Sequence, residues 1–581
     1  MPNTCRVLLV VPRFCGQSFW EFTAACEIYG ARFPSAPLGL ITVAALLPPH
    51  WECRLINRNT EELTVDDLRW ADMIMTGGML PQRWDAVEVI ALGQAQGKPV
   101  VVGGPDVSSI PEIYAAADFR VLGEAEGIID KFIAAWDAGV RKGVFEAEKF
   151  KVDVTKTPVP RYDLLKREHY AYLGVQFSRG CPFTCEFCDI IELYGRAPRT
   201  KTHEQVLREL ETIYQTGHRG LVDFVDDNFV GNRKAVKTFL PHLIAWQKAR
   251  GYPFEFSTEA SINLADDDAL LALMHEANFF AVFIGIESPD DDTLVATQKK
   301  QNTRRSIVEG VHKINRSGLI VAAGFIIGFD SEKGSIADKM IEFIEEASIP
   351  VCTVSLLYAL PNTQLTRRLT EEGRVFPITY TEDRVAMGGA DWSVWGLNFH
   401  TARNRRDILV DNKKVLERIY DPAAYYKRVR TIMRMVDRKP LECSPSPDPP
   451  PPSIAGISLF DLKLFLRLLW RIAVWQPRVL PHFCSVFYEG VRHYPEFLGY
   501  VGMLAAMYLH LGPFSRFVMA VSEKQIAAID SGAWQAPPRE PVRRKESPVR
   551  SRYVHGLPRN NRSAAVADNE STLATDAAAR V

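Results

Sequence analysis

Three cysteines in one ten-residue stretch constrain this chain more than any other feature. Residues 179–188 place Cys181, Cys185 and Cys188 at the spacing C-x3-C-x2-C. Three thiolates can hold three irons of a 4Fe–4S cube and leave the fourth iron open to chelation by a small molecule. A structural zinc site needs a fourth Cys or His close by, and the next His downstream, His203, lies outside zinc spacing. The pattern therefore predicts an open-site iron–sulfur cluster with these three cysteines as ligands.

Length and composition are typical of a soluble protein with several domains. The chain has 581 residues, of which 47% are hydrophobic and 24% charged. Its formal net charge of -1 gives no general attraction to nucleic acid or membranes, and 10 Cys over this length make no disulfide framework. The first apolar run, 7–11, is too short for a signal peptide, and we expect no membrane span. We therefore expect a cytoplasmic protein.

Residues 1–145 alternate between short apolar runs and helical stretches. The runs lie at 7–11, 53–57, 73–76, 100–102 and 119–122. This spacing predicts a doubly wound parallel sheet, whose ligands bind beyond the carboxyl ends of the strands. Candidate binding residues at those ends are Thr76, Gly77, Gly78, Gly103 and Gly104. A single glycine pair is more simply a tight turn, but several glycine-rich ends in one sheet favour a bound cofactor.

A second alternating series follows a predicted linker at 146–170. Strands are expected at 172–177, 220–225, 254–259, 280–287, 319–327 and 351–357. Six strands with helices between them predict a partial (β/α)6 barrel over 171–365, with chemistry at the carboxyl ends of the strands. The predicted fold is therefore α/β, with a doubly wound sheet followed by an open barrel.

The remaining chain is expected to form a C-terminal extension at 366–440, a proline-rich linker at 441–453, a helical region at 454–521 and a disordered tail at 522–581. Within the helical region, Lys463, Arg467 and Arg471 recur every four residues among apolar side chains. Such a helix can lie in a membrane interface, or it can pack on the barrel with its basic face in water. Both interpretations remain open.

The cysteine spacing after a first barrel strand, with the aromatic Phe187 just before the last Cys, resembles the radical S-adenosylmethionine (SAM) superfamily. The resemblance implies that the amino and carboxylate groups of SAM chelate the open iron. It also implies that an electron, from a donor such as flavodoxin or ferredoxin, cleaves the sulfonium and releases a 5′-deoxyadenosyl radical.

The same resemblance assigns SAM-binding candidates at later strand ends. Hydrogen-bond acceptors there would bind the SAM ammonium group, and a carboxylate would bind the ribose. A segment that resembles G-x-I-x-G-x-x-E, with Asp330 near the position of the motif's Glu, would line the adenine. The candidates are Phe187, Asp226, Asp227, Asn228, Glu259, Glu287, Gly324 and Gly328. Each acid is also compatible with a helix cap or a surface ion pair.

The N-terminal series resembles cobalamin-binding domains. Residues 76–78 stand near the S-x-L position of that family, and 103–104 match its later Gly-Gly. The family often carries a D-x-H-x-x-G loop whose His ligates cobalt, but residues 12–17 contain no His. The resemblance therefore implies cobalamin without a His ligand from this loop, and the missing His equally suits a domain that has lost its cobalamin.

Together the two domains resemble the cobalamin-dependent radical methylases, in the branch that contains the hopanoid C-2 methylase, over roughly residues 5–510. The resemblance implies methylation of an unactivated carbon of a small molecule or lipid such as a hopanoid. One SAM would methylate cobalamin, and a second would supply the radical. A lipid substrate implies peripheral contact with the inner face of the membrane. No catalytic residue is assigned.

Two other classes of function remain open. One is a radical SAM enzyme with a non-methylating reaction, such as cyclisation, oxidation or methylthiolation; the other is a non-catalytic iron–sulfur protein. Methylthiolation of RNA is disfavoured because Cys5, Cys15, Cys26 and Cys53 form no second cluster pattern. No basic nucleic-acid-binding domain is present in the sequence, so we expect no nucleic-acid partner.

Overall fold

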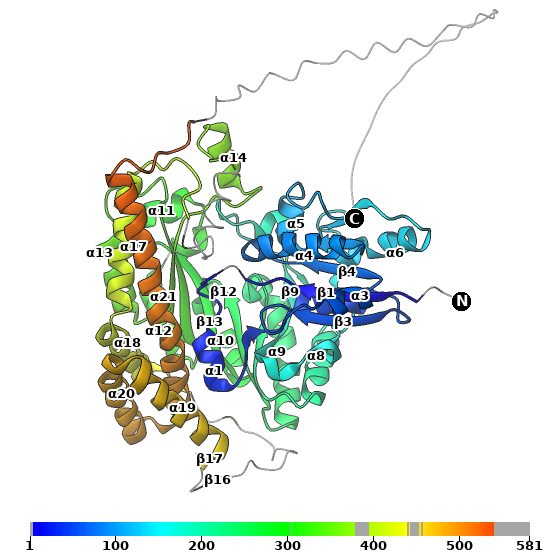
Figure 1. The fold of residues 1–581 in the computed structure, drawn as a ribbon. Coiled ribbons are helices and arrows are strands. Elements are labelled where there is room, and N and C mark those ends of the chain that lie inside the picture. The colour runs from blue at the N-terminus through cyan, green and yellow to red at the C-terminus, as the bar shows by residue number, and fades with distance from the viewer. Residues whose placement is uncertain are drawn as a thin grey trace, which may run out of the picture. The chain divides into compact units, whose positions relative to one another are not determined.

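The computed structural model describes residues 4–14, 16–303, 305–377, 394, 396–438, 441, 453–454 and 457–539. Over this part of the chain, two parallel sheets are followed by a helical C-terminal region (Figure 1). Nearly all of the predicted proline-rich linker and residues 540–581 of the predicted tail lie outside the described residues.

The N-terminal sheet has six parallel strands. In order across the sheet they are β3 (Glu52–Asn57), β1 (Arg6–Val11), β4 (Met73–Gly77), β5 (Val100–Gly103), β6 (Phe119–Leu122) and β7 (Gly143–Glu146). Strand β1 is buried on both faces, which explains its unbroken apolar run.

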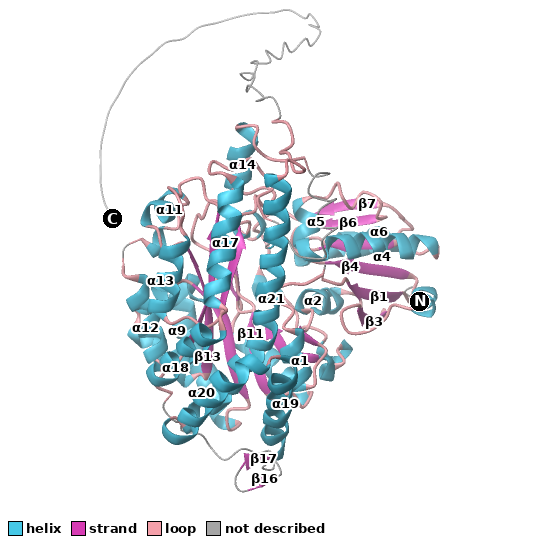
Figure 2. Ribbon diagram, turned by 60° about the vertical axis from the view of Figure 1, so that its left-hand side comes forward, coloured by secondary structure: helices cyan, strands magenta, loops and turns pink. Residues whose placement is uncertain are grey.

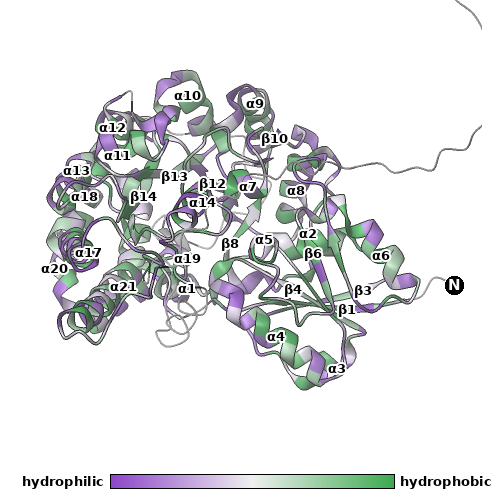
Figure 3. Cartoon of the chain, turned by 90° about the horizontal axis from the view of Figure 1, so that it is seen from above, coloured by the Kyte–Doolittle hydropathy of each residue, from purple (hydrophilic) through white to green (hydrophobic). Residues whose placement is uncertain are grey.

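Helices cover both faces of this sheet. The helices α3 (Val65–Trp70) and α4 (Arg83–Ala95) lie on one side, and α2 (Leu38–Leu46) and α6 (Ile129–Asp137) lie on the other (Figure 3). The sheet therefore separates two apolar cores, and the predicted doubly wound fold is confirmed.

The second sheet is an open half-barrel of seven parallel strands. Its order is β15 (Cys352–Leu356), β14 (Ile320–Ile327), β13 (Phe279–Glu287), β12 (Phe254–Ala260), β11 (Gly220–Phe224), β8 (Tyr170–Val175) and β2 (Phe33–Ser35). The six predicted strands appear in chain order, and Figure 2 shows them in magenta between the helices.

The strand β2 was not predicted. It belongs to the stretch assigned to the N-terminal domain, yet it pairs with β8 in the half-barrel. Residues 1–145 therefore contribute to both sheets rather than to one. A strand of three residues is too short to give a periodic signal in the sequence, which is why the pattern missed it.

Alternate residues of the half-barrel strands face its concave side. In β12, Phe254 and Phe256 are buried behind the sheet, whereas Glu255, Ser257 and Glu259 are half-buried. Successive side chains of a strand point to opposite faces, so these three polar residues line the interior. The interior is thus the place where ligand-binding groups can gather.

The C-terminal region consists of helices packed on one edge of the half-barrel. The main ones are α17 (Arg405–Ile419), α18 (Pro422–Met435), α19 (Leu459–Trp475), α20 (Leu480–His493) and α21 (Leu498–Asp530). Helices α17 and α21 lie side by side (Figures 1 and 2). The tail predicted from residue 522 is wrong at its start, because α21 continues to Asp530 with Val518, Val521 and Gln525 buried.

Among the described helices, that of Pro495–Asp530 alone is long and apolar enough to cross a membrane by length and composition. The sequence analysis predicted no such segment, because no uncharged run of this length occurs. In the structure, 56% of its most apolar window is buried against other elements. This burial is typical of the core helix of a globular protein.

Candidate functional site

The cysteine loop follows β8 at the carboxyl end of the half-barrel. Cys185 is buried, and Cys181 and Cys188 are half-buried. The loop opens at Gly180, where φ is +96° and an added Cβ would lie 2.9 Å from the carbonyl oxygen of Gly195. Only glycine fits this conformation without strain, so the Gly of the motif has a structural reason.

Two of the predicted SAM ligands hold the entrance of this loop. The Asp226 carboxylate accepts hydrogen bonds from the backbone N–H of Phe177 at 2.9 Å and from the N–H and hydroxyl of Ser178 at 2.5 Å. Asp227 accepts from the Gly180 N–H at 2.9 Å. Burial raises the pKa of Asp226 to about 7 and that of Asp227 to about 6. Both acids therefore position the loop, and contact with SAM stays a prediction.

Two amides point at the cysteine sulfurs. Asn228 Nδ2 lies 3.7 Å from Cys181 Sγ, and Gln301 Nε2 lies 3.6 Å from Cys185 Sγ. Hydrogen bonds to cluster thiolates stabilise the anionic sulfur and tune the potential of a cluster. No three His, Cys, Asp or Glu side chains among the described residues converge on a single metal ion. A cube, which takes each thiolate on a separate iron, does not require such convergence. The donor set therefore fits a 4Fe–4S cluster.

A buried cation lies beside the same loop. Lys299 Nζ is 2.8 Å from Glu287 Oε1 and 5.9 Å from the centre of the Phe187 ring. Burial alone would lower the pKa of Lys299, but the charges of Glu287 and Cys185 outweigh it and raise the pKa. Glu287 has a left-handed φ of 68° at an irregularity of β13. Glu287 is thus engaged by Lys299, and its contact with SAM is untested.

One carboxylate inside the half-barrel has a free oxygen. Glu259 Oε2 is buried and has no hydrogen-bond partner among the described residues. Burial and the neighbouring Asp223 raise the pKa of Glu259 well above its ordinary value. An unpaired buried acceptor is costly and calls for a ligand with hydroxyl donors. The ribose-binding role predicted for Glu259 therefore fits its surroundings.

The segment after β14 is held by an acid other than the expected one. Glu332 Oε1 accepts from the N–H groups of Gly328 and Phe329 at 2.8 and 3.1 Å. Asp330, which stands near the motif position, forms ion pairs with Arg368 and Arg374 instead. Gly328 has a φ of +113°, so it needs glycine. The predicted Gly324 lies on the interior side of β14, and an added Cβ would be 3.2 Å from the Phe283 ring.

The five candidate cobalamin residues, Thr76, Gly77, Gly78, Gly103 and Gly104, line one cavity. It lies at the carboxyl ends of the N-terminal strands, and α2 and the half-barrel residues Gln176 and Arg179 also line it. An added Cβ on Gly77 would lie 2.0 Å from the Gly103 carbonyl oxygen, so strand packing requires this glycine. An added Cβ on Gly39, which also lines the cavity, would meet nothing within 4 Å. The cavity therefore has an open wall that suits a flat ligand.

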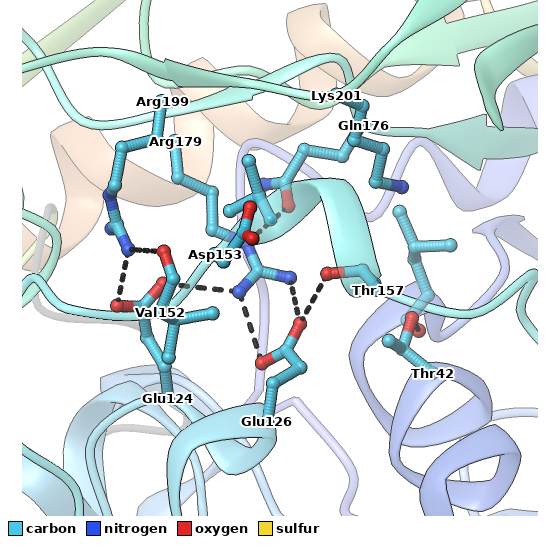
Figure 4. A network of polar contacts seen from close by, with 12 residues as sticks. Thr42, Glu124, Glu126, Val152, Asp153, Thr157, Gln176, Arg179, Arg199 and Lys201 are labelled. Atoms are coloured by element: carbon cyan, nitrogen blue, oxygen red, sulfur yellow. Dashed lines mark hydrogen bonds and ion pairs between the residues drawn. The ribbon is translucent and has the colours of Figure 1, made fainter. Parts of the chain in front are cut away.

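Four charged residues, which we call the interdomain clamp, join this cavity to the cysteine loop. Arg179 donates to Glu124 at 3.1 Å and to Glu126 at 2.7 Å, and Arg199 donates to Glu124 at 2.8 Å (Figure 4). Thr157 donates to Glu126 at 2.9 Å. Arg179 stands two residues before Cys181, while Glu124 and Glu126 line the cavity. The clamp fixes the two predicted cofactor sites relative to each other.

Sequence reasoning missed the clamp, Lys299, Gln301 and Glu332. Arg179 adjoins the cysteine motif, and Glu124 and Glu126 lie in the glycine-containing segment 123–127. Their pairing crosses more than 50 positions of sequence, so no local pattern signals it. Glu332 stands four residues after Gly328. An acid shortly after a glycine turn was the one sequence signal that could have indicated its role.

Comparison with known proteins defines the class first. A model of the radical SAM superfamily matches residues 175–344, and a domain of unknown function, DUF4070, matches 363–524. The radical SAM match begins at the last residue of β8, contains all three cysteines and ends within α13 (Ala337–Ala347). The chain is therefore a radical SAM enzyme, for which the 4Fe–4S cluster and SAM are the expected cofactors.

Two curated relatives then define the family. The chain is 43% identical to an uncharacterized methyltransferase of Synechocystis, over 81% of this chain and 84% of the relative. It is 40% identical to the hopanoid C-2 methylase of Rhodopseudomonas palustris, over 64% of this chain and 71% of the relative. The chain belongs to this family of radical SAM methyltransferases.

Solved structures support the fold. The methyltransferase TsrM of Kitasatospora setae, with cobalamin and a 4Fe–4S cluster bound, matches with a TM-score of 0.53 at 17% identity, over 64% of this chain and 78% of that one. The cobalamin-dependent enzyme OxsB, with aqua-cobalamin and SAM bound, matches with a TM-score of 0.52 at 15% identity, over 92% of this chain and 82% of that one. These two likenesses support the fold described here.

Proposed function

We propose that the protein is a cobalamin-dependent radical SAM methyltransferase that methylates an unactivated carbon of a lipid, C-2 of a hopanoid. The observation that carries this proposal is the interdomain clamp. It joins a residue next to the cysteine loop to the wall of the glycine-lined cavity. A methyl donor in the cavity and a radical source at the loop could then act on one substrate that lies between the two sites.

The protein's own residues bind, orient and exclude water. When bound, the cluster with SAM supplies the radical and cobalamin supplies the methyl group. Cys181, Cys185 and Cys188 would hold the cluster, and Glu259, whose Oε2 is buried without a partner among the described residues, would accept hydrogen bonds from ribose hydroxyls. Thr76, Gly77, Gly78, Gly103 and Gly104 would line the cobalamin site, and residues 12–17, which contain no His, would offer cobalt no imidazole. An electron donor such as flavodoxin or ferredoxin completes the system.

A lipid substrate is supported by two features. One is the 40% identity with the hopanoid C-2 methylase. The other is the apolar character of part of the interior wall, where Phe283 of β13 and Trp20 lie with ring centres 5.3 Å apart. A hydrocarbon carbon has no acidic proton, so radical chemistry is the route that can activate it.

The test is anaerobic turnover of the reconstituted protein. It would receive cobalamin, SAM with a deuterated methyl group and a hopanoid-containing lipid extract, and mass spectrometry would find the label on a hopanoid. The variant Cys185→Ala is the control and should give no label. Formation of 5′-deoxyadenosine without a labelled lipid would favour a non-methylating or different substrate reaction. Absence of 5′-deoxyadenosine would favour a non-catalytic iron–sulfur protein.

A further inference from the structure

Helix α19 lies at the surface and is apolar over most of its circumference, with Asp461, Lys463, Arg467 and Arg471 as its charged residues. Leu468 and Ile472 are buried on its inner side. On the outer side, Leu466, Trp470 and Val474 expose 54%, 58% and 57% of their surface. An apolar outer side on a surface helix is normally covered by protein or lipid.

The exposed apolar residues form one continuous face. Leu459, Leu466, Trp470 and Val474 are spaced by seven, four and four residues, so they lie along one side of the helix. Leu462, Lys463 and Arg467 complete a shallow groove along this side. We call this surface the α19 face. Exposed apolar patches of this kind mark interaction sites.

Two arginines at the margin of the α19 face fasten the helix to the protein. Arg467 donates to the Ile28 carbonyl oxygen of α1 (Thr23–Tyr29) at 3.2 Å, and Arg471 pairs with Glu27 of the same helix. Two of the three residues of the predicted basic stripe are therefore anchors. Figures 1 and 2 show α19 beside α1. The α19 face is thus presented on a fixed helix rather than on a mobile segment.

The segment that contains the α19 face, residues 459–493, is positively charged. Residues 459–493 contain five Lys or Arg and two Asp or Glu. One of the acids, Glu489, is paired with Arg430 and Arg434. Lys463, Arg478 and Arg492 are exposed, and within the described residues none of these three forms an ion pair. The segment that contains the α19 face is therefore basic in a chain whose formal net charge is -1, and Lys463 and Arg467 line the face itself.

We propose that the α19 face docks on an anionic lipid bilayer. This proposal depends on the proposed function in one respect, namely that the substrate is a lipid. Apolar side chains with exposed Trp470 and Trp475 suit the interface between head groups and acyl chains. Basic residues around them are attracted by anionic head groups. A second copy of this chain would bring like charges together, so it is the less suitable occupant.

Deletion of the whole helical region cannot test this proposal, because α21 is a core helix. The test uses the full-length holoenzyme carrying Leu466→Gln, Trp470→Gln and Val474→Gln. The matched control carries Val65→Gln and Val144→Gln, which replace apolar residues that are 47% and 51% exposed elsewhere. Co-sedimentation with phosphatidylglycerol–phosphatidylcholine vesicles is measured against pure phosphatidylcholine vesicles.

The wild-type protein and the control should bind the anionic vesicles, and the triple variant should bind about tenfold or more weakly. The variant Lys463→Glu with Arg478→Glu should weaken binding to anionic vesicles and remove its dependence on salt. Equal binding by the triple variant, equal binding to neutral vesicles, or no binding by the wild type would overturn the proposal. A wild-type dimer that the triple variant dissociates would assign the face to a second copy instead.

Two readouts separate this proposal from the proposed function. Iron content and 5′-deoxyadenosine formation should be the same in the triple variant and the wild type. Methylation of a detergent-solubilised substrate should also be unchanged in the triple variant. Vesicle binding without any labelled lipid would reject the lipid substrate and keep the docking face. Labelled lipid together with unimpaired vesicle binding by the triple variant would keep the lipid substrate and reject the docking face.

Discussion

The cysteine loop and the glycine-lined cavity are both built for cofactors, but they use opposite means. Around the loop, acidic side chains do the work: Asp226 and Asp227 accept from its backbone, and Glu287 pairs with Lys299. Around the cavity, the strand ends are mainly backbone, and the Thr76 hydroxyl is used internally on the Val10 carbonyl oxygen. The cysteine loop is therefore held by side chains, whereas the cavity is shaped by backbone and by glycines that lack side chains.

This difference predicts how each site fails. A side-chain frame fails when one partner is removed, because the other is left buried and unpaired. A backbone frame fails when a side chain is added. The interdomain clamp belongs to both sites, so its loss should affect both.

The largest effect is expected for Cys185→Ala. One of three cluster ligands is lost, so the reconstituted variant should hold no stable 4Fe–4S cluster and form no 5′-deoxyadenosine. Iron and sulfide analysis with electron paramagnetic resonance measures this. Cys352→Ala is the control, since this buried thiol of β15 lies outside the cysteine loop and, among the described residues, donates a hydrogen bond only to the Ile349 carbonyl oxygen. A variant Cys185→Ala with a full cluster would rule out the assignment.

The next effect is expected for Arg179→Gln. Among the described residues it leaves Glu126 without an ion-pair partner and Glu124 with Arg199 alone, and burying an unpaired charge costs about 3–5 kcal/mol of stability. Cluster retention and cobalamin affinity should therefore fall together. Chemical unfolding, iron content and cobalamin absorbance measure the three quantities.

The double variant Arg179→Gln with Glu126→Gln supplies the control for this effect. It removes the unpaired charge while the clamp stays broken, so stability should return in part. Loss of cluster alone, with cobalamin bound as in the wild type, would show that the clamp does not couple the two sites.

The cysteine loop could be predicted from sequence because its chemistry is carried by reactive side chains at short spacing. The half-barrel strands were likewise evident from their apolar runs, and Glu259 from its place at a strand end. The clamp and the Lys299–Glu287 pair join distant positions, and neither partner is unusual in its own segment. The strand β2 was hidden because three residues show no period, and α21 was cut short because its outer face is polar near residue 522.

A smaller effect concerns pH and the interior acids. Burial raises the pKa of Asp223 to about 6, above its ordinary value near 3.8, while its bond with Ser257 lowers it. Below pH 4 the carboxyl is protonated in both states, and as pH rises the unfolded chain ionises first. The stabilisation is therefore present below pH 4 and lost as pH rises through about 6.

The variant Asp223→Asn removes this titration and its repulsion of the neighbouring Glu259. Relative to the wild type, the apo variant should gain up to about 3 kcal/mol of unfolding free energy between pH 4 and pH 8, the equivalent of about two pKa units. Urea unfolding at both pH values measures the gain. Glu255→Gln, on the same strand as Glu259 but bonded to Tyr500, is the comparison variant. Parallel pH profiles for wild type and Asp223→Asn would contradict the interpretation of these acids.

The smallest effect is expected when a side chain is added to the glycine-lined cavity. Gly39 lies in the first turn of α2, lines the cavity and has open space where a Cβ would stand. Gly39→Leu should therefore fold as well as the wild type, or gain up to about 1 kcal/mol, since leucine favours a helix over glycine. Its longer side chain should extend into the cavity and weaken cobalamin binding about tenfold, by loss of shape complementarity.

Gly39→Ala is the matched control, because it gives the same gain for the helix with little added volume. Equilibrium dialysis of cobalamin against both variants, beside thermal unfolding, separates binding from stability. If Gly39→Leu is as stable as the wild type and binds cobalamin equally well, the ligand does not use this cavity. If it binds cobalamin more weakly while its cluster content is unchanged, the two sites are framed independently and only the clamp couples them.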